Sequence, residues 1–413
     1  MTAVLSILKS GASRKVKFLA LFIAVLATLS LVRIWADVLD LTSRGTISAA
    51  LGLAVPIGLA GLGGLWAERA GVVNIGLEGM MILGTFGAGW LGWQYGPWAG
   101  LLGAILFGLL GGGIFALATV TFGVDQIIAG TAINILGLGF AQFFAKIAFS
   151  KAPGGGPTQS PSISALPTFT FDRLSDPLVS LHGKGYFIIS ELAGLISGVF
   201  FRLSILTVFS AGLFAATAFI LWRTPFGLRL RSVGENPHAA DSLGVNVYLY
   251  KYIGVLTSGV MAALGGAFLA IAASGVYREG QTGGRGFIGL ATMIFGNWRP
   301  GGTAIGAGLF GYIDALRLRD ANGTAMRAIV LLGALALIVL AILAIRKKRY
   351  QVVFGLGITA AVLISWFLLT TALPREVALV APYLATLLVL AFASQRLRPP
   401  AADGIPYRKG ESK

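Results

Sequence analysis

Polar side chains that interrupt apolar sequence are the residues through which this chain could do chemistry. The stretch Trp66–Gly84, WAERAGVVNIGLEGMMILG, lies between the apolar segments Thr46–Leu65 and Met80–Trp93. It carries four such side chains: Glu68, Arg69, Asn74 and Glu78. Polar groups are costly at membrane depth, so they persist mostly where they face a cavity or a partner. Two interpretations stay open: a break that lines a pathway, and a cytoplasmic turn in which Glu68 and Arg69 are solvated.

A second stretch, SGVYREGQTGGRGF at Ser274–Phe287, repeats the glycine spacing of the first. The matching glycines are Gly71, Gly76 and Gly79 in the first stretch and Gly275, Gly280 and Gly283 in the second. Each stretch begins with a small residue, Gly and Val, and follows a glycine-rich apolar span. Interrupted helices at matching positions of two inverted halves point to a translocation pathway. The spacing therefore predicts two inverted repeats, with chance as the alternative in a chain of 58 glycines.

The composition indicates which class of protein must position these residues. The chain has 413 residues, of which 56% are hydrophobic and 12% are charged, whereas soluble proteins have about 25% charged residues. Several apolar runs approach the roughly 20 residues that a membrane-spanning helix needs. The sequence therefore predicts an all-α polytopic membrane protein.

The scarcity of reactive side chains excludes several classes of enzyme. Cysteine is absent, and histidine occurs only at His182 and His238. A disulfide, a thiolate metal site and a cysteine nucleophile are thereby excluded, and a histidine metal cluster or a Ser/His/Asp triad is disfavoured. We predict neither an enzyme nor a metal site. The net charge of +16 is assigned to cytoplasmic loops, where Lys and Arg set membrane topology, and not to nucleic-acid binding.

The apolar runs predict about 10–12 transmembrane helices, with broken helices near the pathway. The runs are Phe18–Trp35, Thr46–Leu65, Leu77–Trp93, Trp98–Phe122, Gln126–Phe149, Arg202–Trp222, Tyr252–Ala273, Phe287–Phe295, Thr303–Leu316, Arg327–Ile345, Val352–Thr371 and Val377–Ser394. Lys and Arg are more frequent in the loops that this topology places inside. We therefore expect a multi-pass membrane protein with its N- and C-termini in the cytoplasm; the resemblance described below implies the bacterial inner (plasma) membrane.

The most polar internal segment, residues 223–251, is predicted to lie on the cytoplasmic side. Within it, the sequence GENPHAADSLGV places Pro237 in a plausible first helical turn and Gly244 at a plausible C-cap. We expect a short helix that lies along the cytoplasmic surface and meets a cytosolic partner. An ordinary solvated loop without a partner is the alternative.

Several long motifs together resemble the permease subunits of ABC importers. The motifs are ERAGVVNIGLEGMM (68–81), VGENPHAADSLGV (233–245), EGQTGGRGFIGLATMIFGNWRPGG (279–302), GYIDALRLR (311–319), PYLATLLVLAF (382–392) and RPPAADGIPY (398–407). They extend over most of the chain and are similar to the branched-chain amino acid, simple sugar and nucleoside permease family. The NIGLEG form, FGNW and the GIPY-like tail most resemble the nucleoside (simple-sugar-type) permeases.

The resemblance implies a membrane-spanning permease that moves a nucleoside or simple sugar by alternating access, driven by a separate ATPase. The coupling segment of the family, which docks on that ATPase, matches Gly234, Glu235, Asn236, Pro237, His238, Ala239, Ala240 and Gly244. No phosphate-binding loop G-x-x-x-x-G-K-[ST] occurs in the sequence. We therefore expect no cofactor in this chain and expect ATP and Mg²⁺ to be used by the partner ATPase.

Four partners follow from the same resemblance. They are a cytosolic ABC ATPase, a second and non-identical permease subunit, an extracytoplasmic substrate-binding protein and membrane lipid; no nucleic acid is expected. The alternative function is an ion-coupled secondary transporter of a small polar solute. The GENPHAADSLGV segment and the dependence on a separate ATPase distinguish the two.

The translocation pathway is predicted to be lined or gated by polar side chains of both stretches. These are Glu68, Asn74, Glu78, Arg278, Glu279 and Gln281. A neutral, hydroxyl-rich substrate calls for hydrogen-bonding groups more than for charge. Structural roles are the alternative, because Arg278 and Glu279 could lie in an external loop. Asn134 and Gln142, within an apolar span, are predicted to make interhelical hydrogen bonds.

The resemblance implies a single transmembrane permease domain over residues 1–413. Within it we expect a periplasmic (external) loop at 150–201, with a short helix at Gly185–Phe201, a cytoplasmic coupling loop at 223–251 and a basic cytoplasmic tail at 395–413. Relatives pass almost directly from the GYIDAL span to the last span. Residues 320–375 are therefore interpreted as an inserted helical hairpin, for which no role is predicted.

Overall fold

The computed structural model describes residues 13–319, 324–346, 348, 350–371 and 397–410. Over these residues the chain is almost entirely helical, and the strands β1 (Thr168–Phe169) and β2 (Leu203–Ser204) have two residues each. The prediction of an all-α polytopic membrane protein is confirmed. The predicted last span, Val377–Ser394, lies outside the described residues.

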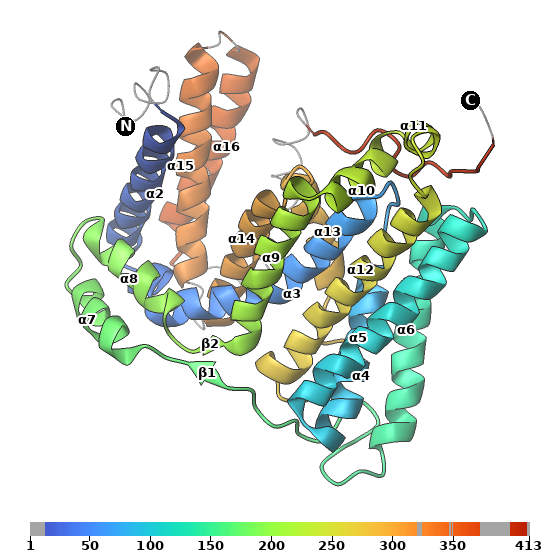
Figure 1. The fold of residues 1–413 in the computed structure, drawn as a ribbon. Coiled ribbons are helices and arrows are strands. Elements are labelled where there is room, and N and C mark those ends of the chain that lie inside the picture. The colour runs from blue at the N-terminus through green and yellow to red at the C-terminus, as the bar shows by residue number, and fades with distance from the viewer. Residues whose placement is uncertain (1–12, 320–323, 347, 349, 372–396, 411–413) are drawn as a thin grey trace. The chain divides into compact units, whose positions relative to one another are not determined.

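The chain divides into two compact units, and Figure 1 labels the helices of which they consist. Unit 1 takes its described residues from Met1–Ala50, Phe169–Arg202 and Tyr312–Tyr383, and unit 2 from Leu51–Thr168, Leu203–Gly311 and Leu384–Lys413. The chain passes from one unit to the other within α3 (Arg44–Arg69) and α14 (Pro300–Arg319). The single domain over residues 1–413 stays a prediction.

Most helices belong entirely to one of the two units. Unit 1 contains α2 (Arg14–Ala36), the 3₁₀-helix η1 (Leu39–Thr42), α7 (Asp172–Gly183), α8 (Ile189–Val199), α15 (Thr324–Arg346) and α16 (Tyr350–Leu369). Unit 2 contains α4 (Leu77–Tyr95), α5 (Pro97–Ala116), the π-helix η2 (Leu117–Thr121), α6 (Gln126–Phe149), α9 (Ile205–Arg223), α10 (Pro225–Glu235), α11 (Pro237–Ser242), α12 (Val247–Ala267), the π-helix η3 (Phe268–Ala273) and α13 (Arg285–Phe295).

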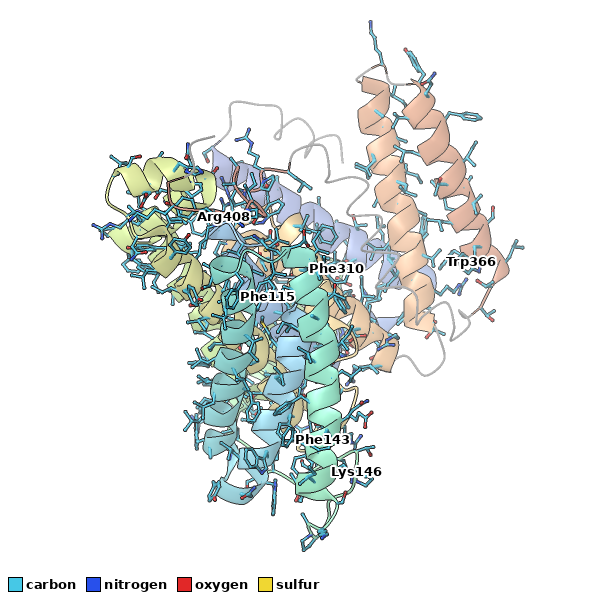
Figure 2. The ribbon with its side chains drawn as sticks, turned by 90° about the vertical axis from the view of Figure 1, so that its right-hand side faces the viewer. Phe115, Phe143, Lys146, Phe310, Trp366 and Arg408 are labelled. Carbon is cyan, nitrogen blue, oxygen red and sulfur yellow. The ribbon has the colours of Figure 1, made fainter. Side chains whose placement is uncertain are left out.

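Six helices among the described residues are long and apolar enough to cross a membrane. They are Arg44–Arg69, Pro97–Thr121, Gln126–Phe149, Ile205–Arg223, Val247–Ala273 and Tyr350–Leu369. Helix α6 carries large apolar side chains on its surface; Phe143, for example, is 62% exposed. Phe143 and Lys146 project from the same part of α6 in Figure 2. Apolar side chains on the outside of a membrane helix need no partner other than lipid.

Glycine allows α4, α5 and α12 to pack closely in the centre of unit 2. A Cβ atom placed on Gly84 of α4 would lie 2.3 Å from the carbonyl oxygen of Ala263 in α12. Helices α5 and α12 meet glycine against glycine, because a Cβ on Gly259 would lie 2.3 Å from the oxygen of Gly108. Small residues allow this close approach of backbones in membrane helices.

The helix boundaries differ most from prediction at the start of α12. The polar segment was expected to extend to Lys251, but α12 begins at Val247. The cause is a local cap, since the side-chain oxygen of Asn246 accepts the Leu249 N–H at 3.1 Å. Lys251 therefore lies within a membrane helix, where it is 3% exposed.

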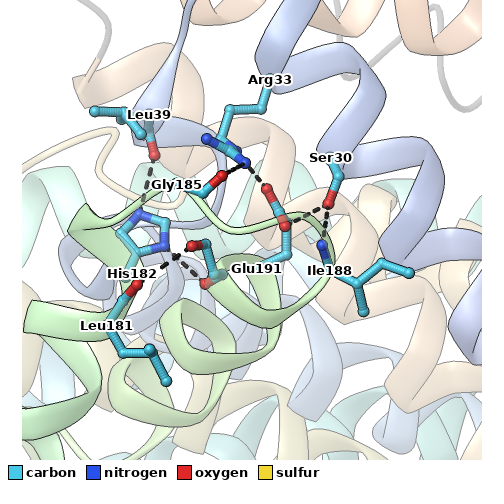
Figure 3. Close-up of polar contacts among 9 residues, drawn as sticks. Ser30, Arg33, Leu39, Leu181, His182, Gly185, Ile188 and Glu191 are labelled. Carbon is cyan, nitrogen blue, oxygen red and sulfur yellow. Dashed lines mark hydrogen bonds and ion pairs between the residues drawn. The ribbon is translucent and has the colours of Figure 1, made fainter.

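A buried polar network holds α2 and α8 together in unit 1 (Figure 3). The Arg33 guanidinium donates through Nε to a Glu191 carboxylate oxygen at 2.5 Å and through Nη2 to the Gly185 carbonyl at 2.7 Å. The Ser30 hydroxyl donates to the other Glu191 oxygen and accepts the Ile188 N–H at 2.8 Å. Because both ionised side chains are hydrogen-bonded on several sides, their burial is compensated.

The region predicted as an external loop contains the helices α7 and α8. Helix α8 covers most of the predicted short helix Gly185–Phe201, whereas α7 was not predicted. His182 in α7 faces two backbone carbonyls, those of Ser190 at 2.8 Å and Leu39 at 3.3 Å. This histidine therefore has a structural environment within unit 1.

The helices α15 and α16 occupy the range interpreted as an inserted hairpin. They pack against each other in unit 1. Arg327 of α15 donates through Nε and Nη2 to the Phe367 carbonyl of α16, at 3.0 and 2.8 Å. The helical pair is therefore joined by polar contacts as well as apolar ones, while its insertion relative to relatives stays a prediction.

Candidate functional site

The first glycine-rich stretch forms a break between α3 and α4. Helix α3 ends at Arg69, the backbone turns at Gly71 with φ of 77°, and α4 begins at Leu77. Glycine adopts such positive φ values without the steric cost that other residues meet. The ammonium group of Lys251 donates to the Gly71 carbonyl at 3.1 Å. The break is therefore a defined turn whose buried Gly71 carbonyl accepts a hydrogen bond from α12.

Asn74 lies in the interior of the break. Its side chain is fully buried, its amide nitrogen donates to the Ser258 hydroxyl at 2.8 Å, and its oxygen accepts the Gly76 N–H at 2.9 Å. These contacts differ from those of a turn solvated at the membrane edge. A buried amide of this kind offers hydrogen-bonding groups without net charge.

Asn134 joins the break to α6 in the manner predicted for an interhelical residue. Its oxygen accepts the Gly79 N–H at 2.8 Å, and its nitrogen donates to the Ile75 carbonyl at 3.1 Å. The backbones approach closely here, because a Cβ on Gly79 would lie 2.3 Å from the Ile133 carbonyl oxygen. The amide of Asn134 thus fixes the start of α4 against α6 through two hydrogen bonds.

Glu78 joins the two glycine-rich stretches directly. One carboxylate oxygen accepts the Gly284 N–H at 2.9 Å, and the other accepts the Gly286 N–H at 2.6 Å. Both donors belong to the N-terminus of α13, where N–H groups have no partner within the helix. A negative charge is also favoured there by the helix dipole. Because Glu78 is 7% exposed, the contact is a buried bridge between α4 and α13.

The two stretches share their glycine spacing but only part of their backbone conformation. Gly71 and Gly275 both have positive φ, at 77° and 67°. Gly280 and Gly283 also have positive φ, whereas their counterparts Gly76 and Gly79 serve close packing against α6. The inverted repeat is thus supported by the shared glycine spacing in the sequence, and in the structure by one matched pair of turns, at Gly71 and Gly275.

Arg278, Glu279 and Gln281 lie in a loop that precedes α13. Arg278 and Glu279 are exposed, and Glu279 accepts a hydrogen bond from Gln142 of α6 at 2.6 Å. The Gln281 side-chain oxygen accepts the Arg278 N–H at 3.2 Å. Residues 156–163 pair with this loop, since the Glu279 N–H donates to the Thr158 carbonyl at 2.9 Å. These three residues form a polar loop that is separate from the contacts of Glu78.

Glu68 lies at the end of α3 in a buried polar cluster. It is 4% exposed, accepts a hydrogen bond from the Trp298 indole N–H and lies close to the carboxyl group of Asp403. Its neighbour Arg69 instead donates to the Trp298 carbonyl, at 3.1 and 2.7 Å, and pairs with Glu235 at 3.8 Å. Glu68 and Arg69 thus both contact Trp298, through its indole N–H and its carbonyl respectively, and Arg69 also pairs with the half-exposed Glu235.

The predicted short helix is present within residues 223–251 as α11. Asn236 caps it by accepting the Ala239 N–H at 3.0 Å, and Pro237 is its first residue. Gly244 follows its end with φ of 80°. The preceding helix α10 reaches the break, because a Cβ on Gly234 would lie 2.3 Å from the Arg69 carbonyl oxygen.

The structure thus places the predicted pathway residues in three groups within unit 2. Asn74 and Glu78 lie at the break, Glu68 lies beside the end of α10, and the loop before α13 carries the other three. Sequence reasoning missed Lys251 and Trp298, which complete these groups. Within the described residues, no cluster of three or more His, Asp or Glu side chains could hold a metal ion.

Comparison with known proteins identifies several relatives. The family described as branched-chain amino acid transport system / permease component matches residues 46–321. The guanosine ABC transporter permease protein NupQ of Bacillus subtilis is 34% identical over 372 residues, which cover 88% of this chain and 97% of that protein.

Two further relatives cover less of the chain. The nucleoside ABC transporter permease protein NupC of Lactococcus lactis is 36% identical over 63% of this chain and 78% of its own. The putative glucose ABC transporter permease protein TsgC13 of Haloferax volcanii is 34% identical over 67% and 78%. No solved structure gives a significant match.

Proposed function

The chain belongs to the family of permease components of branched-chain amino acid transport systems, and we propose from this premise that it carries a nucleoside or simple sugar. It is a multi-pass membrane permease subunit of an ABC importer and not an enzyme. Permeases of this class work with an ATPase and a substrate-binding protein. The names of the relatives, for guanosine, nucleosides and glucose, support a neutral and hydroxyl-rich substrate.

One observation carries the proposal at the level of the site: Glu78 bridges the break after α3 and the N-terminus of α13. Broken helices of two related halves form the substrate pathway in many transporters. In the proposed cycle the two halves move against each other around this bridge. Asn74 offers uncharged hydrogen-bonding groups along the pathway, Arg278, Glu279 and Gln281 form its external mouth, and Glu68 lies at its cytoplasmic end.

The energy for this movement enters through α11. In the proposal, the segment Gly234–Gly244 docks on the cytosolic ATPase, which uses ATP and Mg²⁺, while this chain itself holds no cofactor. The close contact of Gly234 with the Arg69 carbonyl supports a mechanical connection from the docking segment to the break. Rigid-body movement of such an element is a common way to switch between two states.

The assembly has further features that belong to the same proposal. The second permease subunit is non-identical, the complex lies in the bacterial inner membrane among its lipids, and both termini are cytoplasmic. The ion-coupled alternative is disfavoured, because the relatives are named as ABC transporter permeases and the helix α11 has no role in it.

Uptake into proteoliposomes tests the proposal. The permease is reconstituted with its candidate ATPase, second permease subunit and binding protein, and radiolabelled guanosine, uridine, glucose and leucine are offered in parallel. Each substrate is measured with and without internal ATP, with an ionophore that collapses ion gradients, and with the second permease subunit omitted.

The outcomes are distinct. Nucleoside or sugar uptake that needs ATP and survives the ionophore is the expected result, and its loss without the second subunit supports a non-identical pair. Uptake of leucine alone would overturn the proposed substrate class. Uptake that persists without the ATPase and stops with the ionophore would overturn the importer itself.

A further inference from the structure

Residues 397–410 return to unit 2 and run across the ends of several of its helices. The Arg398 N–H donates to the side-chain oxygen of Asn297, in the turn between α13 and α14, at 2.8 Å. The Ala402 N–H donates to the Gly234 carbonyl at the end of α10 at 2.9 Å. The Ala401 N–H donates to a Glu235 carboxylate oxygen at 3.1 Å. The backbone of this segment is therefore held by specific hydrogen bonds.

The same segment contacts the break between α3 and α4. A Cβ on Gly71 would lie 3.3 Å from the Ala402 carbonyl oxygen, and one on Gly404 would lie 3.4 Å from the Val73 side chain. The Lys251 ammonium group lies between the Gly71 carbonyl at 3.1 Å and the Ile405 carbonyl at 3.5 Å. One side chain thus ties the turn of the break to the C-terminal segment.

Asp403 adds a buried contact at this place. Its carboxyl group lies close to that of Glu68, so the two carboxylates would repel each other when both are ionised. Burial raises the pKa of Asp403 to about 6, and the nearby Lys251 ammonium group opposes that rise. The segment is therefore packed into unit 2 through its backbone hydrogen bonds and the Lys251 ammonium group, while the buried Oδ1 atom of Asp403 has no hydrogen-bond partner among the described residues.

Tyr407 attaches the other end of the segment to α11. Its side chain is buried, at 6% exposed. Its ring lies 5.1 Å from the His238 ring of α11 and 5.5 Å from the Tyr248 ring of α12, measured between centroids. The carboxylate of Asp241 in α11 lies near the hydroxyl group of Tyr407. Aromatic pairs at such distances are stabilising beyond their buried area.

Helix α11 needs such an anchor because it is short. It has six residues, of which only Pro237 and Ala240 are buried. A helix of this length has little stability of its own, and its position depends on tertiary contacts. Tyr407 supplies the large buried side chain that α11 lacks.

We propose that residues 397–410 position the coupling segment, with Tyr407 as the positioning residue, so that movement of α11 is transmitted to the break at Gly71. This inference rests on the proposed function, since α11 is there the contact with the ATPase. Three links connect the docking helix to the pathway: Tyr407 on α11, Ala402 on α10, and the Lys251 ammonium group between Ile405 and Gly71.

The experiment compares substitutions of Tyr407 in the full reconstituted complex. Tyr407→Ala removes the ring, Tyr407→Leu keeps apolar volume without the aromatic contacts, and Tyr407→Phe keeps the ring but loses the hydroxyl. Lys409→Ala, at an exposed position in the same segment, is the matched control. Three quantities are measured: ATPase retained on the purified permease, ATP hydrolysed, and substrate molecules taken up per ATP.

The expected result separates coupling from assembly. Tyr407→Ala and Tyr407→Leu should retain the ATPase and hydrolyse ATP, while uptake per ATP falls about tenfold, which corresponds to about 1.4 kcal/mol of lost positioning. Tyr407→Phe and Lys409→Ala should stay within about twofold of the parent. If Tyr407→Ala does not assemble, the milder Tyr407→Leu decides. Parental uptake per ATP in the leucine variant would overturn the proposal.

A second measurement is independent of transport. Hydrogen exchange at the backbone amides of α11 is followed in the resting complex of the parent and the Tyr407→Leu variant. Faster exchange confined to α11 and the break supports the positioning role, whereas unchanged exchange at both places overturns it. A parent that shows no ATP-dependent uptake would contradict the proposed function, and this measurement would still decide the role of Tyr407.

Discussion

Replacing Glu78 by glutamine tests whether the bridge from α4 to α13 governs stability and transport. In the parent, the two carboxylate oxygens accept the N–H groups of Gly284 and Gly286, at 2.9 and 2.6 Å. Glutamine keeps one oxygen for one of these donors, but its NH₂ group faces the other. The variant therefore loses one charge-assisted hydrogen bond and leaves one buried N–H without an acceptor.

The magnitude follows from the type of hydrogen bond. A bond to a charged group contributes about 1.5–3 kcal/mol, which exceeds the roughly 0.6 kcal/mol found on average between membrane helices. Because Glu78 is 7% exposed, water does not readily replace the lost partner. We expect Glu78→Gln to lower the free energy of unfolding by about 2 kcal/mol and Glu78→Ala, which loses both bonds, by about 4 kcal/mol. About 2 kcal/mol also shifts an equilibrium between joined and separated helices roughly 30-fold.

The assays are chemical denaturation of the purified complex and ATP-driven uptake in proteoliposomes. Glu279→Gln is the stability control, because Glu279 is exposed and the substitution keeps an oxygen that can accept the hydrogen bond from Gln142. We expect the control to retain parental stability, and we expect Glu78→Gln to lose stability and to change the uptake rate while it still inserts and binds the ATPase. Parental stability and uptake in Glu78→Gln would refute the reasoning from the bridge.

Three further substitutions have expected outcomes. Glu191→Ala leaves Arg33 buried without its carboxylate partner, so the free energy of unfolding measured by chemical denaturation should fall by about 3–5 kcal/mol. A denaturation midpoint equal to that of the parent would contradict this. Gly137→Ala would place a Cβ 2.6 Å from a carbonyl oxygen of α4 and should lower thermal stability, whereas Gly139→Ala on the same helix meets nothing within 4 Å and should not. Asn236→Ala removes the cap of α11, which costs about 1 kcal/mol, so amide exchange in α11 should accelerate about fivefold; equal rates would show that the cap is dispensable.

Features that depend on neighbouring residues could be predicted from the sequence. The break after α3 follows from glycine and polar residues placed close together in apolar sequence. The helix α11 follows from Asn236 and Pro237, whose capping and first-turn preferences act over three or four positions. The interhelical role of Asn134 follows from the presence of an amide side chain within an apolar run. In each case the interaction that determines the structure is between residues close in sequence, or the apolar residues on either side imply that the polar side chain is buried.

Features that depend on distant partners could not be predicted. Glu68 and Trp298 are 230 positions apart in the sequence, and Lys251 and Gly71 are 180 apart. Neither pair has a local signal, so Lys251 was assigned to a polar loop although its charge is satisfied inside unit 2. The glycine spacing misleads in a similar way, because it does not distinguish a glycine that turns the backbone from one that allows close packing. The conformation of each position is decided by the helix that packs against it.

The glycine contact between α5 and α12 has a consequence for how unit 2 can move. Where Gly108 meets Gly259, backbone lies against backbone, so no rotamer has to change when one helix slides past the other. Ridges of large side chains, which normally resist shear between packed helices, are missing from this contact. Resistance to sliding must then come from directional bonds at the helix ends. A Cβ at Gly259 would lie 2.3 Å from the Gly108 carbonyl oxygen, so a single added methyl group there would sterically oppose this sliding.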